Sequence, residues 1–180
     1  RPPRSTHLCT LFPCTALFRS LRAMNDMANV YLKQNRYPEA ERLYSETFVI
    51  RKRVLGPEHP STLSSMSNLA LVYLRQGRFP EAERLDSKAL EIRKRTLGPK
   101  HPDTLTCMYN LACVVALSGD RENAIRWLRQ AVEGGYSNAE QLAQDADLES
   151  LHGPEVDALL EQVRRNAAAA RAPDTVPRNP

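Results

Sequence analysis

The sequence is poor in aromatic residues, glycine and cysteine, and it contains no long apolar run. Aromatic residues make up 6% of its 180 positions, and there are seven glycines and four cysteines. No stretch approaches the roughly 18 consecutive apolar residues that cross a bilayer. These shortages exclude membrane-spanning, collagen-like and disulfide-scaffold proteins. The 42% apolar and 26% charged residues are ordinary for a folded domain or a short repeat array.

Most of the net positive charge of the chain comes from its first 20 residues. The net charge is +4, from 25 basic and 21 acidic residues. Arg1, Arg4 and Arg19 lie in this stretch, which has no acidic residue, so the rest of the chain carries only +1. Two later basic triplets, 51–53 and 93–95, lack the interleaved aromatic residues typical of single-stranded nucleic-acid sites. We therefore predict no nucleic-acid partner and no membrane partner, with DNA binding through the triplets as the alternative.

Residues 1–20 share no pattern with the sequence that follows. Residues 10–20, TLFPCTALFRS, agree at nine of 11 positions with TLFPYTTLFRS, a translated sequencing adapter. The leader is therefore predicted to be non-native, which would make the chain a C-terminal fragment. The alternatives are a native disordered leader and a signal peptide. Pro13 and the scattered polar residues interrupt the apolar stretch that a signal peptide needs.

The dominant signal is a repeat with a period of 42 residues. Residues 24–63 and 66–105 are identical at 25 of 40 positions. Among the shared segments, Ile50–Arg53 recurs as Ile92–Arg95, and Leu55–Pro57 recurs as Leu97–Pro99. A fixed period of this size predicts a stacked array of similar structural units.

Each repeat is predicted to form two helices. In the first helix, apolar residues at i, i+3, i+4 and i+7 form one stripe. Its members in the three repeats are Met24, Met27, Ala28 and Tyr31, then Met66, Leu69, Ala70 and Tyr73, then Met108, Leu111, Ala112 and Val115. The second helix is expected to bury Ala82, Leu85, Ala89 and Ile92. Between the helices, Asn35, Gly77 and Gly119 are expected to adopt the left-handed cap.

This pattern resembles the tetratricopeptide repeat, more narrowly the 42-residue variant of kinesin light chains, nephrocystin-like proteins and many bacterial repeat proteins. The resemblance covers about residues 22–133 and implies three helix-hairpin repeats, 21–60, 61–102 and 103–133, in an all-α right-handed superhelix. The residues that carry it are Asn68-Leu69-Ala70, Tyr73, Gln76-Gly77-Arg78-Phe79, Glu81-Ala82-Glu83, Leu97-Gly98-Pro99 and His101-Pro102. The third repeat departs from the pattern at Val115, Asp120 and Asn123, as terminal repeats often do.

Residues 134–165 are predicted to form a helical cap, and residues 166–180 a disordered tail. Ser137 and Glu140 have the spacing of a capping box that starts a short helix. The closing segment resembles the last segment of bacterial tetratricopeptide proteins, many of which carry an upstream serine/threonine kinase domain. A docking or regulatory region of such an enzyme is therefore the alternative function of this chain.

No catalytic, cofactor or metal site is predicted. His59 and His101 occupy equivalent turns one repeat apart, which favours a structural role over a convergent site. Cys107 and Cys113 lie six residues apart on one helix and face different directions, unlike closely spaced zinc ligands. Unpaired thiols indicate a reducing, cytoplasmic setting. The visible chain is therefore predicted not to be an enzyme.

A protein or peptide partner is predicted instead, because the resemblance implies a concave groove lined by the first helix of each repeat. Asn68 and Asn110 are the leading candidates, since an amide can both donate to and accept from a peptide backbone. Lys33 and Arg75 would favour an acidic residue in the ligand. The full predicted groove set is Asp26, Asn29, Lys33, Ser64, Asn68, Leu71, Arg75, Thr106 and Asn110. If upstream repeats are missing, the exposed apolar face of the first repeat predicts self-association of residues 21–180.

Overall fold

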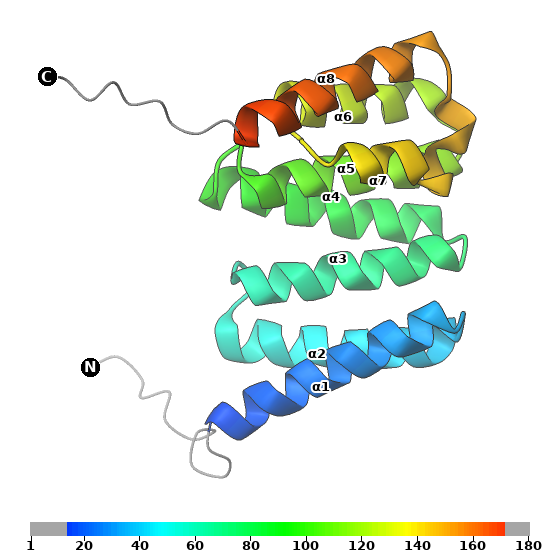
Figure 1. The fold of residues 1–180 in the computed structure, drawn as a ribbon. Coiled ribbons are helices and arrows are strands. Elements are labelled where there is room, and N and C mark those ends of the chain that lie inside the picture. The colour runs from blue at the N-terminus through cyan, green and yellow to red at the C-terminus, as the bar shows by residue number, and fades with distance from the viewer. Residues whose placement is uncertain (1–13, 172–180) are drawn as a thin grey trace, which may run out of the picture. The chain divides into compact units, whose positions relative to one another are not determined.

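The computed structural model describes residues 14–171, with side chains from Leu17 onward, and this part of the chain is all-α. Its regular elements are α1 Cys14–Lys33, α2 Tyr37–Leu55, α3 Pro60–Arg75, α4 Phe79–Thr96, α5 Pro102–Leu117, α6 Arg121–Glu133, α7 Ala139–Gln144, the 3-10 helix η1 Ala146–Leu151, and α8 Pro154–Arg171 (Figure 1). The predicted fold class, an all-α protein of helix-hairpin repeats, is confirmed. The chain divides into two compact units, residues 1–76 and 77–180.

The repeat turns form as the sequence predicted. Asn35, Gly77 and Gly119 have φ angles of 59°, 74° and 92°, in the left-handed region that glycine and asparagine tolerate best. The connection between repeats is capped by histidine. The His59 Nδ1 atom accepts from the Ser61 N–H at 3.1 Å, and His101 accepts from the Asp103 N–H at 3.2 Å. Each histidine thus satisfies a backbone donor of the helix that follows.

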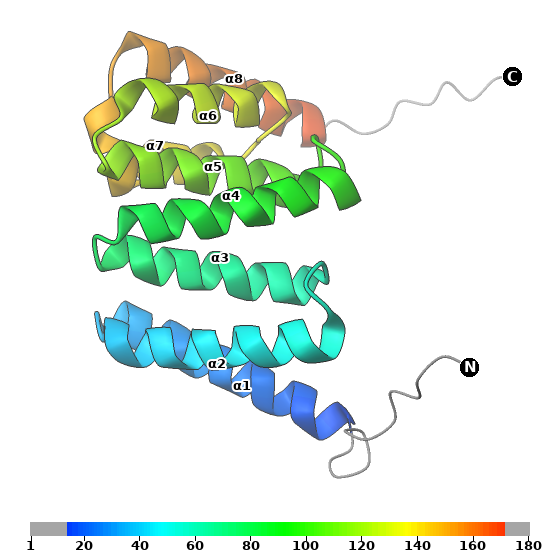
Figure 2. The same ribbon diagram turned by 180° about the vertical axis from the view of Figure 1, so that it is seen from behind.

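In the first unit, α2 packs against α1 on one side and against α3 on the other (Figure 2). Fully buried alanines, Ala28, Ala40 and Ala70, lie in this packing and allow the helices to approach closely. The predicted stripe of α3 is buried at Met66, Leu69 and Ala70 and half-buried at Tyr73. In α1 the prediction is wrong for Met27, which is 53% exposed, because no described helix lies over that side of α1.

In the second unit, α5 packs between α4 and α6, and α8 runs along α6 (Figure 2). The predicted buried face of α4 is present, with Ala82, Ala89 and Ile92 buried and Leu85 half-buried. The connection from α6 to α7 is held by α8, because the Asn166 amide donates to the carbonyl oxygens of Val132 and Tyr136 at 2.9 Å. Helix α8 therefore continues to Arg171, beyond the point where the tail was predicted to begin.

Two further boundaries differ from the sequence predictions. Helix α1 begins at Cys14, inside the leader predicted for residues 1–20, and residues 1–13 lie outside the described part. Asn138, not Ser137, caps α7. The Asn138 side-chain oxygen accepts from the Gln141 N–H at 3.1 Å, while the Asn138 side-chain amide donates to the Gln141 side-chain oxygen at 3.0 Å. The two residues that cap α7 are therefore Asn138 and Gln141, one residue after the predicted pair of Ser137 and Glu140.

The basic triplets at the ends of α2 and α4 are only partly exposed to solvent. Their first arginines tie each second helix to the next repeat. The Arg51 guanidinium donates to the Ser65 hydroxyl at 2.7 Å and to the Ser61 carbonyl oxygen at 3.2 Å. Arg93, 7% exposed, donates to the Cys107 sulfur. The guanidinium groups of Arg51 and Arg93 can be buried at these positions because each has a hydrogen-bond partner.

Two residues of the third repeat that depart from the repeat pattern replace an ion pair of the earlier repeats with a hydrogen-bonded pair. In the earlier repeats, an arginine pairs with a glutamate three residues on. Arg36 contacts Glu39 at 2.7 Å, and Arg78 contacts Glu81 at 3.0 Å. The third repeat has Asp120 and Asn123 at these positions, and the Asn123 N–H donates to Asp120 at 3.1 Å. These hydrogen bonds lower the pKa of Asp120, so its carboxylate is a charged N-cap of α6.

Removing a histidine cap should cost modest stability. His59→Ala and His101→Ala each remove a side-chain acceptor from an α-helix N-terminus, a loss of about 1 kcal/mol. For a chain of this size that corresponds to a melting temperature lower by about 2–4 °C, measurable by circular dichroism. His152→Ala is the matched control, because His152 is exposed in the closing segment. An equal shift in the control would contradict the capping role.

Candidate peptide-binding surface

In the first unit, the predicted groove residues lie along α1 and α3. Asn29, Asn68 and Leu71 are half-buried, and the other predicted residues are exposed. The set therefore belongs to the surface of the unit and not to its core. The exposed members are Asp26, Lys33, Ser64 and Arg75. The surface therefore has amides near its floor and charged side chains at its edges.

The amides of this surface are connected by hydrogen bonds within the unit. The Asn68 amide donates to the Asn25 side-chain oxygen at 3.0 Å, which joins α3 to α1. The Tyr44 hydroxyl donates to the Asn29 side-chain oxygen at 2.5 Å, which joins α2 to α1. Each bond uses only part of an amide's capacity, since an asparagine offers two donors and an acceptor. The sequence did not reveal Asn25, although its spacing, four residues before Asn29, places both on one helix face.

Tyr44 gives this surface a rigid, uncharged floor. The residue is 1% exposed, and burial, together with the nearby Asp26 carboxylate, raises the pKa of Tyr44 to about 12. The phenol therefore keeps its proton and holds the Asn29 side chain in a fixed orientation.

In the second unit, the chain's own closing segment covers much of the corresponding face of α5. Thr106 is exposed and Asn110 is half-buried, but Cys113 is 4% exposed and Tyr109 1% exposed. The Tyr109 ring stacks on Tyr136, with ring centroids 5.0 Å apart and an interplanar angle of 11°. Of the groove residues predicted on α5, only Thr106 is exposed.

Asp145 is the centre of this covering contact. Its carboxylate accepts from the Tyr109 hydroxyl at 2.6 Å and caps η1 by accepting from the Asp147 N–H at 3.0 Å. The Cys113 thiol lies 3.8 Å from the same carboxylate. Burial raises the pKa of Tyr109, and burial with the neighbouring carboxylates raises the pKa of Cys113. Both groups stay protonated and act as hydrogen-bond donors.

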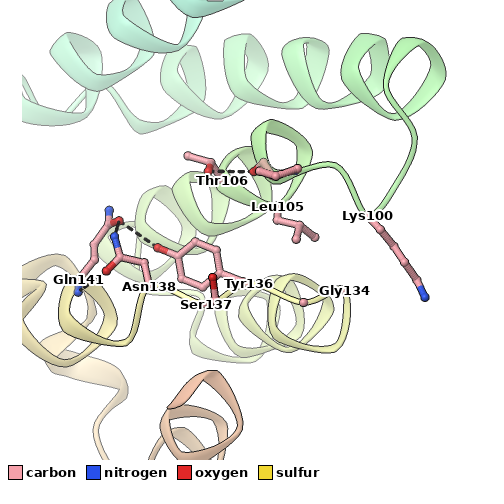
Figure 3. A pocket seen from close by; sticks show the side chains of 10 residues that line it. Lys100, Leu105, Thr106, Gly134, Tyr136, Ser137, Asn138 and Gln141 are labelled. Carbon is pink, nitrogen blue, oxygen red and sulfur yellow. Dashed lines mark hydrogen bonds between the residues drawn. The ribbon is translucent and has the colours of Figure 1, made fainter. Parts of the chain in front are cut away.

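A pocket of about 260 Å³ remains where α5 meets the segment after α6 (Figure 3). Lys100 and Thr106 border it on one side, and Tyr136, Asn138 and Gln141 on the other. The Tyr136 hydroxyl and the Asn138 amide both donate to the Gln141 side-chain oxygen, at 2.9 Å and 3.0 Å. The pocket is open and polar, so it suits a peptide side chain or terminus better than an apolar ligand.

One group of potential metal ligands exists among the described residues. Cys113, Asp145 and Asp147 bring one ligand atom each within 4.8 Å of one another. These groups already contact one another and Tyr109: the Asp145 carboxylate accepts from the Tyr109 hydroxyl and lies 3.8 Å from the Cys113 thiol. The arrangement therefore serves the closing contact, and it offers no activated nucleophile either. His59 and His101 are occupied as helix caps, consistent with the structural role expected for them.

These features define a class: an all-α helical-repeat protein whose first helices carry polar side chains on their uncovered faces. The tetratricopeptide repeat family model matches residues 19–86 and 64–135. The chain therefore belongs to the tetratricopeptide repeat family. Proteins of this family are typically non-catalytic interaction scaffolds. No helix in the described part is long and apolar enough to span a bilayer.

Solved structures with this fold include relatives of kinesin light chains. The crystal structure of BtubC (BKLC) from P. vanneervenii has a TM-score of 0.65 at 17% identity, covering 89% of this chain and 68% of its own. Two structures from Podosopora anserina, of a kinesin light chain protein with nearly identical TPR-like repeats, have TM-scores of 0.61 and 0.58. Their identities are 25% and 24%, covering 85% and 84% of this chain and 77% and 97% of theirs. No curated protein matches the chain.

Breaking the Asp145 contact should expose Cys113 selectively. Asp145→Ala removes the acceptor of the Tyr109 hydroxyl and the cap of η1, each contributing about 1 kcal/mol or more. Local opening of the closing segment should become at least about tenfold more frequent, and alkylation of Cys113, followed by mass spectrometry, should accelerate equally. Cys107 is buried beside Arg93 and is the internal control. Equal acceleration at Cys107 would mean global unfolding and would contradict a local role.

The chain should lose stability in alkaline solution. The folded-state pKa values of Tyr44, Tyr109 and Tyr136 are raised above the ordinary value of 10, so the folded state keeps protons that the unfolded state releases. This stability is complete below pH 10 and declines as pH rises toward the folded pKa, about 12 for Tyr44. Urea unfolding at a series of pH values should show the decline, with a shallower slope for Tyr44→Phe. Parallel slopes would contradict the assignment.

Proposed function

We propose that this chain is a non-catalytic protein-interaction module that holds an extended peptide segment against the first helices of its repeats. The observation that carries this proposal is the amide surface of the first unit. Asn25, Asn29 and Asn68 come from two helices, are joined or oriented by hydrogen bonds, and are only half-buried. Such side chains are positioned before a ligand arrives, which lowers the entropic cost of binding.

The chemistry of the surface favours a peptide with an acidic residue. An extended peptide has unpaired backbone N–H and C=O groups, and asparagine amides can pair with both kinds. Lys33 lies exposed on α1, and Arg75 lies exposed at the equivalent position of α3. Cations at these places attract a carboxylate, while Asp26 repels one at the α1 edge. The acidic residue of the ligand should therefore lie near the C-terminal ends of these helices.

In the second unit, only the Thr106 end of the surface is proposed to contact a ligand. Tyr136 and Asp145 already contact Tyr109 and Cys113. A peptide that binds at these two residues would have to displace them. The proposed site is accordingly Asp26, Asn29, Lys33, Ser64, Asn68, Leu71 and Arg75 in the first unit. Thr106 and Asn110 in the second unit are proposed as a separate contact surface. The kinase-docking alternative rests on sequence resemblance alone and stays a prediction.

A displayed library of random dodecapeptides, panned on the immobilised full chain, tests this function. Enriched peptides should contain Asp or Glu, and Asn68→Ala should weaken the best of them about tenfold in fluorescence anisotropy. That factor corresponds to one or two lost hydrogen bonds of about 1 kcal/mol each. Lys33→Glu should weaken binding further as salt is lowered, because repulsion is then less screened.

Two substitutions on the exposed face of α4 are matched controls, Ser87→Ala and Lys88→Glu. Neither should change the affinity by more than about twofold, within the usual scatter for distant surface sites. Enrichment of no peptide, or equal affinity for wild type and Asn68→Ala, would contradict the proposed surface.

A further inference from the structure

The outer face of α1 exposes two large apolar side chains that the repeat pattern elsewhere buries. Met27 is 53% exposed and Val30 is 49% exposed. Their counterparts 42 residues on, Leu69 and Val72, are 6% and 0% exposed, and those 84 residues on, Leu111 and Val114, are 0% and 1% exposed. The first repeat thus presents, uncovered, a face that both later repeats cover.

A neighbouring helix covers this face in the later repeats. In the first unit, Arg51 of α2 donates to Ser65, which lies on the same side of α3 as Val72. In the second unit, Arg93 of α4 donates to Cys107, which lies on the same side of α5 as Val114. The α1 residue aligned with Ser65 and Cys107 is Ala23. The face formed by Ala23, Met27 and Val30 is therefore shaped to receive a helix.

The spacing along this face is that of a helix pair. Ser20, Ala23, Met27 and Val30 follow one another at intervals of three, four and three residues, the alternation of a coiled-coil seam. The two small residues at the N-terminal end permit a close approach of backbones. Met24 and Tyr31, half-buried on the adjoining edge, widen the apolar strip.

The charges beside the seam select the orientation of the second helix. Asp26 and Lys33 are exposed on one edge of α1 and are seven residues apart, so they occupy the same heptad position. In an antiparallel pair, equivalent flanking positions face one another across the seam. When Met27 packs against Val30 of a second copy, Asp26 lies opposite Lys33 of that copy, and the two-fold axis repeats the pair. A parallel pair would place Asp26 opposite Tyr31 and form no ion pair.

We propose that two copies of this chain associate through α1, antiparallel and two-fold symmetric, with the surface formed by Ser20, Ala23, Met27 and Val30 as the seam. The surface is self-complementary in heptad spacing and charge, and a two-fold contact of this kind closes as a dimer. The other large exposed apolar side chains are single. They are Phe18, Val49, Val54, Leu97 and Leu117, and none has an exposed apolar neighbour three or four residues away on the described part of its helix.

Association in this way would engage Asp26 and Lys33, which also border the proposed peptide surface. The half-buried amides Asn25, Asn29 and Asn68 lie on the other side of that edge and stay accessible. Dimer formation should therefore alter the charge preference of the peptide surface without closing it. The two proposals can fail separately, because substitutions at Met27 and Val30 leave the amides in place.

Sedimentation velocity and light scattering of the full 180-residue chain, over a concentration series, test the proposal. We expect a monomer–dimer equilibrium for the wild type and a monomer for Met27→Glu and for Val30→Glu, because each places two charges in the seam. Both positions are about half exposed in the single chain, so circular dichroism should show unchanged helix content. Val49→Glu, on the exposed side of α2, is the matched control and should remain dimeric.

A charge exchange tests the antiparallel register. Asp26→Lys should weaken the dimer about tenfold, since two exposed ion pairs become repulsive. The double variant Asp26→Lys with Lys33→Asp reverses both partners and should restore the wild-type dissociation constant. A wild type that is monomeric at every concentration, a dimer that survives Met27→Glu, or a double variant that stays as weak as Asp26→Lys would each overturn the proposal.

Discussion

The structure depends on one constraint: a pair of amphipathic helices cannot bury both its apolar faces by itself. Each hairpin must lay one helix against the next, and the contact is close because alanines lie in it. Ala28, Ala40 and Ala70 in the first unit, and Ala82, Ala89 and Ala112 in the second, are completely buried. A larger side chain at these points would force the helices apart. The 42-residue period of the sequence arises because each repeat needs the same residues at these contacts.

Polar groups make this packing specific. Apolar contact alone would tolerate a shift of one helix along its neighbour, whereas a buried donor and acceptor have one mutual position. Arg51 with Ser65, and Arg93 with Cys107, set the position of each second helix on the following first helix. Tyr109 with Asp145 does the same for the closing segment. Both proposed interaction surfaces are faces that packing leaves uncovered, namely the amide surface and the outer side of α1.

The helix pair of each repeat and the turn within it could be predicted from sequence because each depends on a few neighbouring residues. Gly77 and Asn35 adopt the expected left-handed turn, and His59 takes the structural role expected of it. The errors occur where a distant segment intervenes. Met27 has a buried pattern but an exposed side chain, and α8, which contacts Val132 and Tyr136 through Asn166, continues past the predicted start of the tail. Local spacing records which side of a helix is apolar, but it does not record what lies there.

The sequence by itself determined the class of fold, since 25 identical positions in 40 repeat the same local signals and therefore the same helix hairpin. It also indicated which helix faces are apolar and which carry amides. Only the tertiary structure decided which of those faces are open. The Asn25–Asn68 bond links residues 43 positions apart, and the Tyr109–Asp145 bond links residues 36 positions apart. Contacts of that range depend on the three-dimensional path of the chain, because no periodicity within one helix specifies the partner across it.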